Sequence, residues 1–304
     1  MRPLTEHLDR YLALRRALGY QLRGHGRVLM SLLSYMEEAG ETTVTVRITQ
    51  AWVDRVGADD AAHLLSVVRG FATYLSGFDP STEVPPTWLA PASNRRVRPY
   101  LFTKGQIDAL IDSADLLHPR LWAKTMASLI GLLAATGLRP GEAYRLDCTE
   151  VDLQGRELRV LNSKYGRSRL LPLHETTVDA LARYAEARNR LAAPSEPAFF
   201  LSRSGRRIGS GEASMAFRRL LDDCAITVPV GRRPPRLYDF RHSFAVNTLV
   251  DWHRAGLDVR RQLPALSAYL GHLVPGNTYW YLEATPELLS TVAGRMSSLF
   301  EAKR

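Results

Sequence analysis

The spacing of apolar residues in the first part of the chain predicts a bundle of short helices. Apolar side chains recur at intervals of three and four residues, the period that places them on one face of a helix. This pattern covers residues 4–18, 28–36, 51–56 and 64–75. Gly19, Gly40 and Gly77 follow three of these stretches as stop signals, and Thr49 is the expected cap of the third. We therefore expect a compact all-helical unit over residues 1–79.

A change in composition marks the end of this unit. Residues 80–99 contain five prolines and a basic cluster made of Arg95, Arg96 and Arg98. Proline-rich segments are extended and semi-rigid, so this stretch is predicted to be a linker between two domains. A basic linker can follow a phosphate backbone, and a solvated tether is an equally open interpretation.

The pattern beyond residue 100 is again mainly helical, with one small hairpin. Two short β-type runs, residues 157–161 and 169–173, flank a polar turn, which predicts two antiparallel strands. The predicted helices cover residues 103–114, 121–136, 177–191, 212–224, 240–255, 264–270 and 286–301. Thr103 is the expected cap of the first of them. The predicted fold class is therefore mainly α with a small β-hairpin.

The charge balance favours a polyanionic partner. The 304 residues carry a formal net charge of +9, and nucleic acid is the usual partner of such a chain, although many basic proteins bind none. Lysine occurs only at positions 104, 124, 164 and 303, so arginine supplies almost all of the positive charge. A lysine within an arginine-rich patch is therefore a candidate for chemistry that arginine cannot perform.

Several classes of protein are disfavoured. Cys148 and Cys224 are the only cysteines and form no CxxC pair, so we expect neither a disulfide framework nor structural zinc. No stretch approaches the roughly 20 apolar residues that span a bilayer, and the N-terminus lacks an apolar signal core. We expect a cytoplasmic protein without a membrane partner. There is no GxxxxGK[ST] loop and no carboxylate cluster for two metal ions, so we expect no cofactor and no metal.

Arg139 is the first candidate for phosphate chemistry. It lies in the turn Gly137-Leu138-Arg139-Pro140-Gly141-Glu142, directly after a predicted core helix. The guanidinium group presents a planar fork of donors that suits a phosphate. Glu142 lies within reach of an ion pair if a helix begins at Pro140. A lone arginine at such a position is more often a surface residue.

Lys164 is the second candidate, because it occupies the predicted hairpin turn among arginines. An ammonium group in a basic pocket can give up its proton and act as a general acid, whereas a guanidinium cannot. A solvated turn lysine is the simpler alternative.

The remaining candidates lie in two clusters. Arg241 and His242 begin a predicted helix, whose N-terminal dipole favours an anion. His272 follows Gly271 at the end of another helix, and Tyr281 lies nine residues later. A phenol can attack phosphorus when cations stabilise the developing charge. A run of aromatic residues such as that around Tyr281 is more commonly part of a core.

Together, these clusters resemble the motifs of the tyrosine recombinase (phage integrase) family over about residues 100–300. Thr136-Gly137-Leu138-Arg139 with Glu142 looks like its first arginine box, and Asp239-Phe240-Arg241-His242-Ser243-Phe244-Ala245 like its second. Leu270-Gly271-His272 with Tyr281 looks like its nucleophile box. The run from Asn277 to Leu288 is similar to transposon-borne and recombinase-in-trio members. The resemblance implies a SAM-like core-binding domain over residues 1–79, a linker over 80–99 and an integrase-type catalytic domain over 100–304.

The resemblance also implies roles for individual residues. Arg139 and Arg241 would bind the scissile phosphate, His272 would donate a hydrogen bond to it, and Tyr281 would form a 3′-phosphotyrosyl link. Lys164 would protonate the departing 5′-oxygen. The supporting residues would be Glu142, Asp239 and His242, and the candidate DNA contacts are Arg95, Arg96, Arg98, Arg167 and Arg169.

Strand exchange in this family implies four protomers on paired double-stranded DNA sites, as a homotetramer or with related recombinases. The predicted last helix, residues 286–301, is the candidate for packing onto a neighbouring protomer, with packing on its own domain as the alternative. The expected role is integration or excision of a mobile element, as in transposition, by a nucleoid-associated protein.

Two features depart from the family pattern. Tyr238 occupies the position of a usual histidine three residues before Arg241, and a phenol is a poor base near neutral pH. Residues 253–262 are a predicted insertion. Tyr238 leaves open a second hypothesis, a catalytically weak DNA-binding protein of the same fold. A type IB topoisomerase, which shares the chemistry, is a third.

Overall fold

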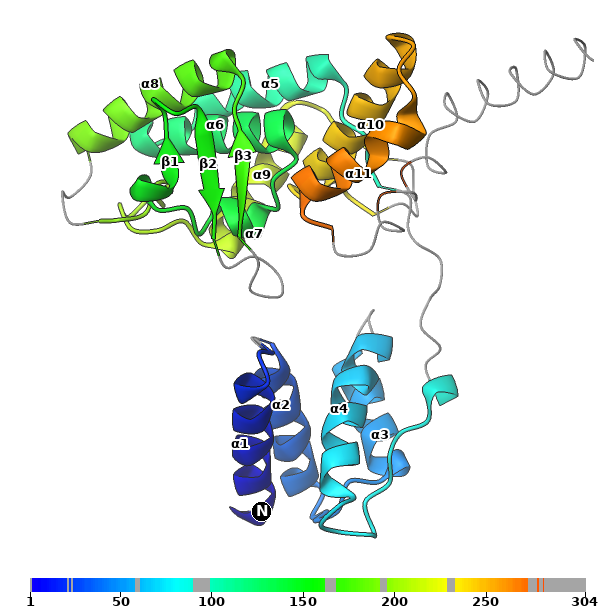
Figure 1. Cartoon of the computed structure of the whole chain (residues 1–304). Coiled ribbons are helices and arrows are strands. Elements are labelled where there is room, and N and C mark those ends of the chain that lie inside the picture. Colours follow the sequence, from blue (N-terminus) through cyan, green and yellow to red (C-terminus); the bar gives the residue numbers. More distant parts are fainter. Residues whose placement is uncertain are drawn as a thin grey trace, which may run out of the picture. The chain divides into compact units, whose positions relative to one another are not determined.

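The structure is a computed structural model, and its described residues form two compact units, Met1–Arg96 and Val97–Arg304. The described residues are 2–20, 22, 24–57, 61–89, 99–161, 168–191, 196–228, 233–272, 278 and 281. Figure 1 shows the first unit as helices only, and the second as helices with one small sheet.

Four helices make up most of the first unit. They are α1 (Arg2–Ala17), α2 (His25–Glu38), α3 (Val46–Val56) and α4 (Ala61–Leu75). Apolar stripes from all four helices meet in one buried cluster, which includes Leu8, Leu32, Trp52 and Phe71. The four helices were predicted from the same stripes, because burial of one apolar face is what stabilises such short helices.

The third helix begins earlier than predicted, at Val46. Thr45 is its cap, since its hydroxyl accepts a hydrogen bond from the Ile48 N–H at 3.2 Å. Thr49, the predicted cap, is fully buried inside the helix, and its hydroxyl donates to the carbonyl of Thr45. The prediction was wrong because the helix begins three residues earlier, where the Val46 N–H donates to the Glu83 carboxylate at 2.6 Å and Ile48 is already buried.

Residues 80–89, assigned to the linker from sequence, pack on the first unit. The Arg69 guanidinium donates to the carbonyls of Pro85 at 2.7 Å and Pro86 at 3.1 Å. The short 3-10 helix η1 (Thr87–Leu89) adds Leu89 to the apolar cluster. Residues 90–98, which include Arg95, Arg96 and Arg98, lie outside the described residues.

In the second unit, α6 (Arg120–Thr136) is the central helix. It packs against α5 (Lys104–Asp115), α7 (Pro140–Ala143), α8 (Glu175–Leu191) and α10 (Asp239–Arg254). Its surface is therefore apolar on several sides, in agreement with a sequence of mostly aliphatic residues. Thr103 caps α5 as predicted, through a reciprocal pair of hydrogen bonds with Gln106.

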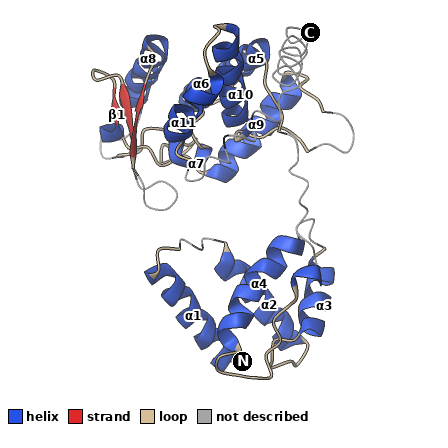
Figure 2. Ribbon diagram, turned by 45° about the vertical axis from the view of Figure 1, so that its right-hand side comes forward, coloured by secondary structure: helices blue, strands red, loops and turns tan. Residues whose placement is uncertain are grey.

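The sheet contains the predicted hairpin and one additional strand. The strands β1 (Val151–Asp152), β2 (Glu157–Val160) and β3 (Arg169–Pro172) are antiparallel in the order β1-β2-β3. The 3-10 helix η2 (Cys148–Glu150) leads into β1. This strand was not predicted from sequence, because it is too short to show an alternation of apolar and polar residues. Leu158 faces Leu171 across the hairpin, and both are fully buried. Figure 2 shows the sheet beside α8.

The last described helices are α9 (Ser210–Asp223), α10 and α11 (Val259–Leu270). Helices α10 and α11 share a small apolar core that includes Leu249, Leu266 and Tyr281. Helix α11 begins before its predicted start at Pro264, because the Asp258 carboxylate caps the N–H groups of Arg260 and Arg261. The predicted insertion over residues 253–262 is thus the end of α10, a turn and the first turn of α11.

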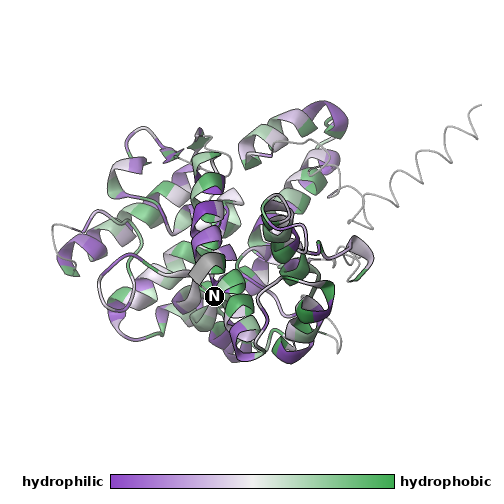
Figure 3. Cartoon of the chain, turned by 90° about the horizontal axis from the view of Figure 1, so that it is seen from below, coloured by the Kyte–Doolittle hydropathy of each residue, from purple (hydrophilic) through white to green (hydrophobic). Residues whose placement is uncertain are grey.

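Individual helices carry both hydrophilic and hydrophobic residues, as the mixture of colours in Figure 3 shows. Within the part of the chain that is described, no helix combines the length and the apolar character needed to cross a membrane. The predicted helix over residues 286–301 lies outside the described residues.

Candidate active site

Arg139 lies at a sharp turn between α6 and α7. The chain leaves α6 through Gly137, which has a left-handed φ of +60°, and Arg139 then caps α7. The Arg139 guanidinium donates to the Glu142 carboxylate at 2.8 Å and to the Gly271 carbonyl at 2.9 Å. Its side chain is 19% exposed. The predicted ion pair with Glu142 is present, and the contact with Gly271 ties this turn to the end of α11.

Gly137 is required at this turn for two physical reasons. Its positive φ disfavours any residue with a Cβ atom. A Cβ there would also lie 2.6 Å from the ring of Phe244 and 3.2 Å from Leu270. The absence of a side chain therefore allows α6, α10 and α11 to meet directly behind Arg139.

Arg241 is completely buried in the first turn of α10. Its guanidinium donates to the carbonyl of Gly137 at 2.9 Å and to that of Leu270 at 2.6 Å. Burial, aided by the positive charge of Arg139, lowers the pKa of Arg241 to about 10, so the group remains a cation at neutral pH. Both guanidinium groups thus donate to backbone carbonyls at the end of α11, Arg139 to Gly271 and Arg241 to Leu270.

Tyr281 lies beside both histidines of the motifs. Its ring centroid is 6.1 Å from that of His272, in a stacked arrangement, and 5.5 Å from that of His242. The Tyr281 side chain is only 2% exposed. Burial raises the pKa of the phenol, and the positive charge of Arg241 opposes this rise. The phenol is therefore protonated at neutral pH in the protein alone.

Both histidines are neutral at pH 7. Burial, followed by the charges of Arg241 and Arg139, lowers the pKa of His272 to about 4. Burial and Arg241 lower the pKa of His242 to about 4 as well. The His272 Nδ1 atom lies 2.8 Å from the Thr278 hydroxyl, which orients the ring. A neutral imidazole still offers one N–H donor and one acceptor nitrogen.

Tyr238 and Asp239 lie at the start of α10 and have different surroundings. Tyr238 is 36% exposed, and its ring meets that of His242 edge-on at 5.2 Å. Asp239 is buried, and its carboxylate accepts the Arg236 backbone N–H at 2.8 Å. Burial raises the pKa of Asp239. Tyr238 thus borders the site, whereas Asp239 holds the turn from which Arg241 emerges.

The structure therefore brings most of the predicted site residues together. Arg139, Glu142, Arg241, His272 and Tyr281 converge from α7, α10 and the segment after α11. Lys164 and Arg167 lie outside the described residues. The described part of the chain contains no cluster of three or more His, Cys, Asp or Glu side chains that could hold a metal ion.

A match to a family of known proteins agrees with this geometry. Residues 101–287 match the model of the phage integrase family. The chain belongs to this family, the tyrosine recombinases. It is 35% identical, over 99% of its own length, to the putative integrase/recombinase y4rB of Sinorhizobium fredii, and it covers 99% of that protein.

Solved structures share the fold of this recombinase. The integrase of transposon Tn1549, in complex with transposon right end DNA, aligns with a TM-score of 0.64 over 96% of this chain and 99% of that one, at 16% identity. A lambda integrase tetramer bound to a Holliday junction aligns with a TM-score of 0.59 over 91% of this chain and 76% of that one, at 18% identity. At such low identity, the likeness concerns the fold alone.

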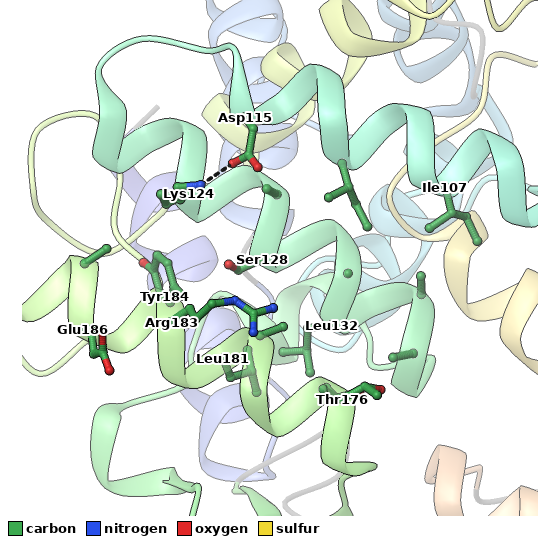
Figure 4. A pocket seen from close by; sticks show the side chains of 18 of the residues that line it. Ile107, Asp115, Lys124, Ser128, Leu132, Thr176, Leu181, Arg183, Tyr184 and Glu186 are labelled. Atoms are coloured by element: carbon green, nitrogen blue, oxygen red, sulfur yellow. Dashed lines mark hydrogen bonds and ion pairs between the residues drawn. The ribbon is translucent and has the colours of Figure 1, made fainter.

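A cleft of about 1010 Å³ lies away from this tyrosine recombinase's motif residues, between α5, α6 and α8. Figure 4 shows its aliphatic lining, with Leu132 and Leu181 in the floor and the Lys124–Asp115 ion pair at one end. None of the motif residues lines it. The cleft and the motif residues are therefore separate features of the second unit.

Sequence analysis missed or misplaced three contributors to the site. Thr278, which orients His272, lies within the nucleophile box but has no motif of its own. Gly271 supplies a carbonyl to Arg139, a role that only the fold reveals. Arg169, predicted to contact DNA, instead points inward, because its guanidinium forms an ion pair with the buried Glu142 at 2.8 Å.

Proposed function

We propose that this recombinase cleaves and rejoins DNA through a 3′-phosphotyrosyl intermediate, with Tyr281 as the nucleophile. The observation that carries the proposal is the position of the Tyr281 phenol, buried against two neutral imidazoles and in the field of Arg241 and Arg139. Two fixed cations beside a phenol suit the transition state of phosphoryl transfer, in which negative charge develops on the non-bridging oxygens.

Arg139 and Arg241 are the proposed phosphate ligands. Each guanidinium has five N–H donors. The hydrogen bonds to Glu142, Gly271, Gly137 and Leu270 fix the two groups while using only part of these donors. Groups held in place before the substrate arrives need no reorganisation during the reaction, which is the main source of electrostatic catalysis.

In the proposed cleavage step, the Tyr281 oxygen forms a bond to phosphorus, and the bond from phosphorus to the 5′-oxygen breaks. The phenolic proton passes to an imidazole, for which the neutral His242 ring is the proposed acceptor, since a bound phosphate anion favours the charged form. His272 donates a hydrogen bond to a non-bridging oxygen. Religation reverses these transfers, so the energy of the phosphodiester is conserved.

Lys164 is the proposed donor of a proton to the departing 5′-oxygen. Support comes from the strand that follows its turn, since β3 begins at Arg169, whose side chain is bound to Glu142 beside Arg139. The strand that directly follows this turn in sequence is therefore anchored beside Arg139.

Tyr238 supports a second candidate function, a DNA-binding protein with weak cleavage activity. Its ring contacts His242 at the edge of the site, where a hydroxyl can donate a hydrogen bond to phosphate but cannot serve as a base at neutral pH. If the first proposal is correct, His242 serves as the base that Tyr238 cannot be, and cleavage is retained.

We also propose that the protein acts on paired double-stranded DNA sites as a tetramer, alone or with related recombinases, in the integration or excision of a mobile element. Support comes from the names of similar proteins, an integrase/recombinase, a transposon integrase and a lambda integrase tetramer on a Holliday junction. Packing of residues 286–301 onto a neighbouring protomer remains a prediction.

The test is recovery of DNA joined to the protein. The full chain is incubated with a pool of random-sequence duplexes, denatured and digested, and the retained DNA is sequenced and rebuilt as a nicked duplex. We expect a covalent adduct from the unaltered protein, none from Tyr281→Phe, and a normal amount from the control Tyr144→Phe. Tight binding without any adduct would support the second candidate. Relaxation of arbitrary supercoiled plasmid would instead favour a topoisomerase.

A further inference from the structure

Arg169 makes more contacts with the motif residues than its position on a hairpin suggests. Its Nη1 and Nη2 atoms donate to the two Glu142 oxygens at 3.0 and 2.8 Å, as a parallel fork. Its Nε atom donates to the Tyr269 carbonyl at 3.0 Å. All three nitrogens are therefore engaged with protein, and the side chain is only 13% exposed.

The same guanidinium also packs against the nucleophile box. A Cβ atom placed on Gly271 would lie 3.1 to 3.3 Å from the guanidinium atoms of Arg169. The residue before His272 must therefore be small, because the Arg169 fork occupies the adjacent space. Arg169 thus connects β3, Glu142 of α7 and the end of α11.

Glu142 is the link between Arg169 and the proposed phosphate ligand Arg139. One Glu142 oxygen accepts from the Arg139 guanidinium at 2.8 Å, and the other accepts from the Arg139 backbone N–H at 3.1 Å. The carboxylate is nearly inaccessible, with 2% of its side chain exposed. A buried carboxylate held by a bidentate arginine has a fixed orientation, and that orientation sets the direction of Arg139.

Resting on the function proposed above, we propose that Arg169 is a positioning residue, which orients Arg139 through Glu142 and holds the nucleophile box in register with it. The competing hypothesis is that Arg169 contacts a DNA phosphate directly, as the sequence suggests. The two differ in chemistry, since a lysine can replace an arginine at a phosphate but cannot reproduce a bidentate fork on a carboxylate.

A double-mutant cycle on the nicked duplex tests this proposal. The cycle compares the unaltered protein with Arg169→Met, Glu142→Gln and the double variant. Two further variants are Arg169→Lys and the control Arg190→Met. Arg190 carries an exposed ion pair with Glu186 on α8, at 3.7 Å. The measurements are the single-turnover rate of adduct formation and the affinity for the same duplex over a range of salt concentrations.

We expect Arg169→Met to slow adduct formation about 100-fold, the effect of a misplaced catalytic group, with an unchanged salt dependence of binding. Arg169→Lys should not restore the rate. In the Glu142→Gln background, Arg169→Met should have little further effect, because the residue through which it acts is already altered. Arg190→Met should behave like the unaltered protein.

The opposite pattern would overturn the proposal. A salt slope reduced by about 0.9, rescue by Arg169→Lys and additive effects in the double variant would indicate a phosphate contact. If Arg169→Met alone does not fold, two comparisons decide the matter: Arg169→Lys with the unaltered protein, and the double variant with Glu142→Gln. The double variant lacks the buried carboxylate that Arg169→Met leaves without its bidentate partner. Absence of an adduct from the unaltered protein would refute the proposed function instead, which separates the two failures.

Discussion

The two units of this recombinase differ in where their charged side chains lie. In the first unit, the core is apolar, and its ion pairs lie at the surface, as between Arg55 and Glu38, whose side chains are each 60% exposed. In the second unit, Arg241 and Glu142 are almost completely buried. Among the described residues, every charged side chain with so little exposure belongs to the second unit.

The difference matters for stability, because buried charges are costly unless they are paired. An exposed ion pair contributes little to stability, whereas a buried charge must be compensated by partners in fixed positions. The second unit provides these partners from carbonyls at Gly137, Leu270 and Gly271 and from Arg169. These partners fix the positions of the buried charges before any ligand is bound.

The largest effect on stability is expected at Glu142. Glu142→Ala would leave Arg139 and Arg169 close together with no carboxylate between them, and should cost about 3–5 kcal/mol of unfolding free energy in the second unit. The matched change in the first unit, Glu38→Ala, should cost below about 1 kcal/mol. Chemical denaturation with hydrogen exchange to assign each unit measures both. Equal losses would contradict the contrast between the units.

Arg139→Ala should affect chemistry more than binding. Loss of one preorganised cation should lower the rate of adduct formation by about 10²–10³-fold. Affinity for the nicked duplex should remain mostly intact, because it is spread over many phosphates. Lys124→Ala, in an exposed ion pair with Asp115, is the control. An unchanged cleavage rate in Arg139→Ala would remove this residue from the site.

Two glycines offer a matched comparison of backbone and packing. Gly57 and Gly137 both end helices with a left-handed φ, of +59° and +60°. Gly57 has open space where a Cβ would be placed, whereas Gly137 faces the Phe244 ring. Gly57→Ala should therefore lower the unfolding free energy only by the cost of a left-handed backbone at alanine, roughly 1–2 kcal/mol. Gly137→Ala should cost roughly 1–3 kcal/mol more through overpacking, as thermal denaturation would show. A similar cost at both positions would mean that Phe244 moves aside freely.

The stability of the second unit is expected to depend on pH. His242 and His272 have pKa values of about 4 in the folded protein, below the ordinary value of 6.5. Between these values the unfolded chain binds more protons than the folded one, so stability should be complete above pH 6.5 and fall as the pH decreases toward 4. Equilibrium denaturation across this window measures the slope. His242→Gln and His272→Gln should each flatten it, and a slope that survives both changes would assign it to other groups.

Much of the fold could be predicted from local patterns. The stripe on α2, the cap at Thr103 and the Leu158–Leu171 hairpin each depend on neighbours in sequence. Errors arose where a boundary depended on distant partners. The Thr49 cap was wrong because the helix begins at Val46, whose N–H donates to the distant Glu83 carboxylate. Residues 80–89 were assigned to a linker because the contacts of Arg69 with Pro85 and Pro86 leave no local signal.

The residues of the candidate site were likewise predictable only in part. Arg139, Arg241, His272 and Tyr281 could be named from sequence because their order resembles the motifs of the tyrosine recombinase family, and that resemblance predicted phosphate chemistry. The direction of Arg169 could not be predicted, because an arginine on a hairpin can point to solvent or inward with equal ease. Glu142 decides between these directions, and it is 27 residues away along the chain.

The sequence by itself determined which elements form, because helix periodicity and capping depend on residues that are close in the chain. It also determined which reactive groups these elements carry, because the motifs can be found from residue types and their order alone. Only the tertiary structure decided which charges are buried and what holds them. Burial of a cation depends on carbonyls and carboxylates delivered by other segments, as Gly137 and Leu270 do for Arg241 across 104 and 29 residues. Such partners are brought together by packing, which no local pattern encodes.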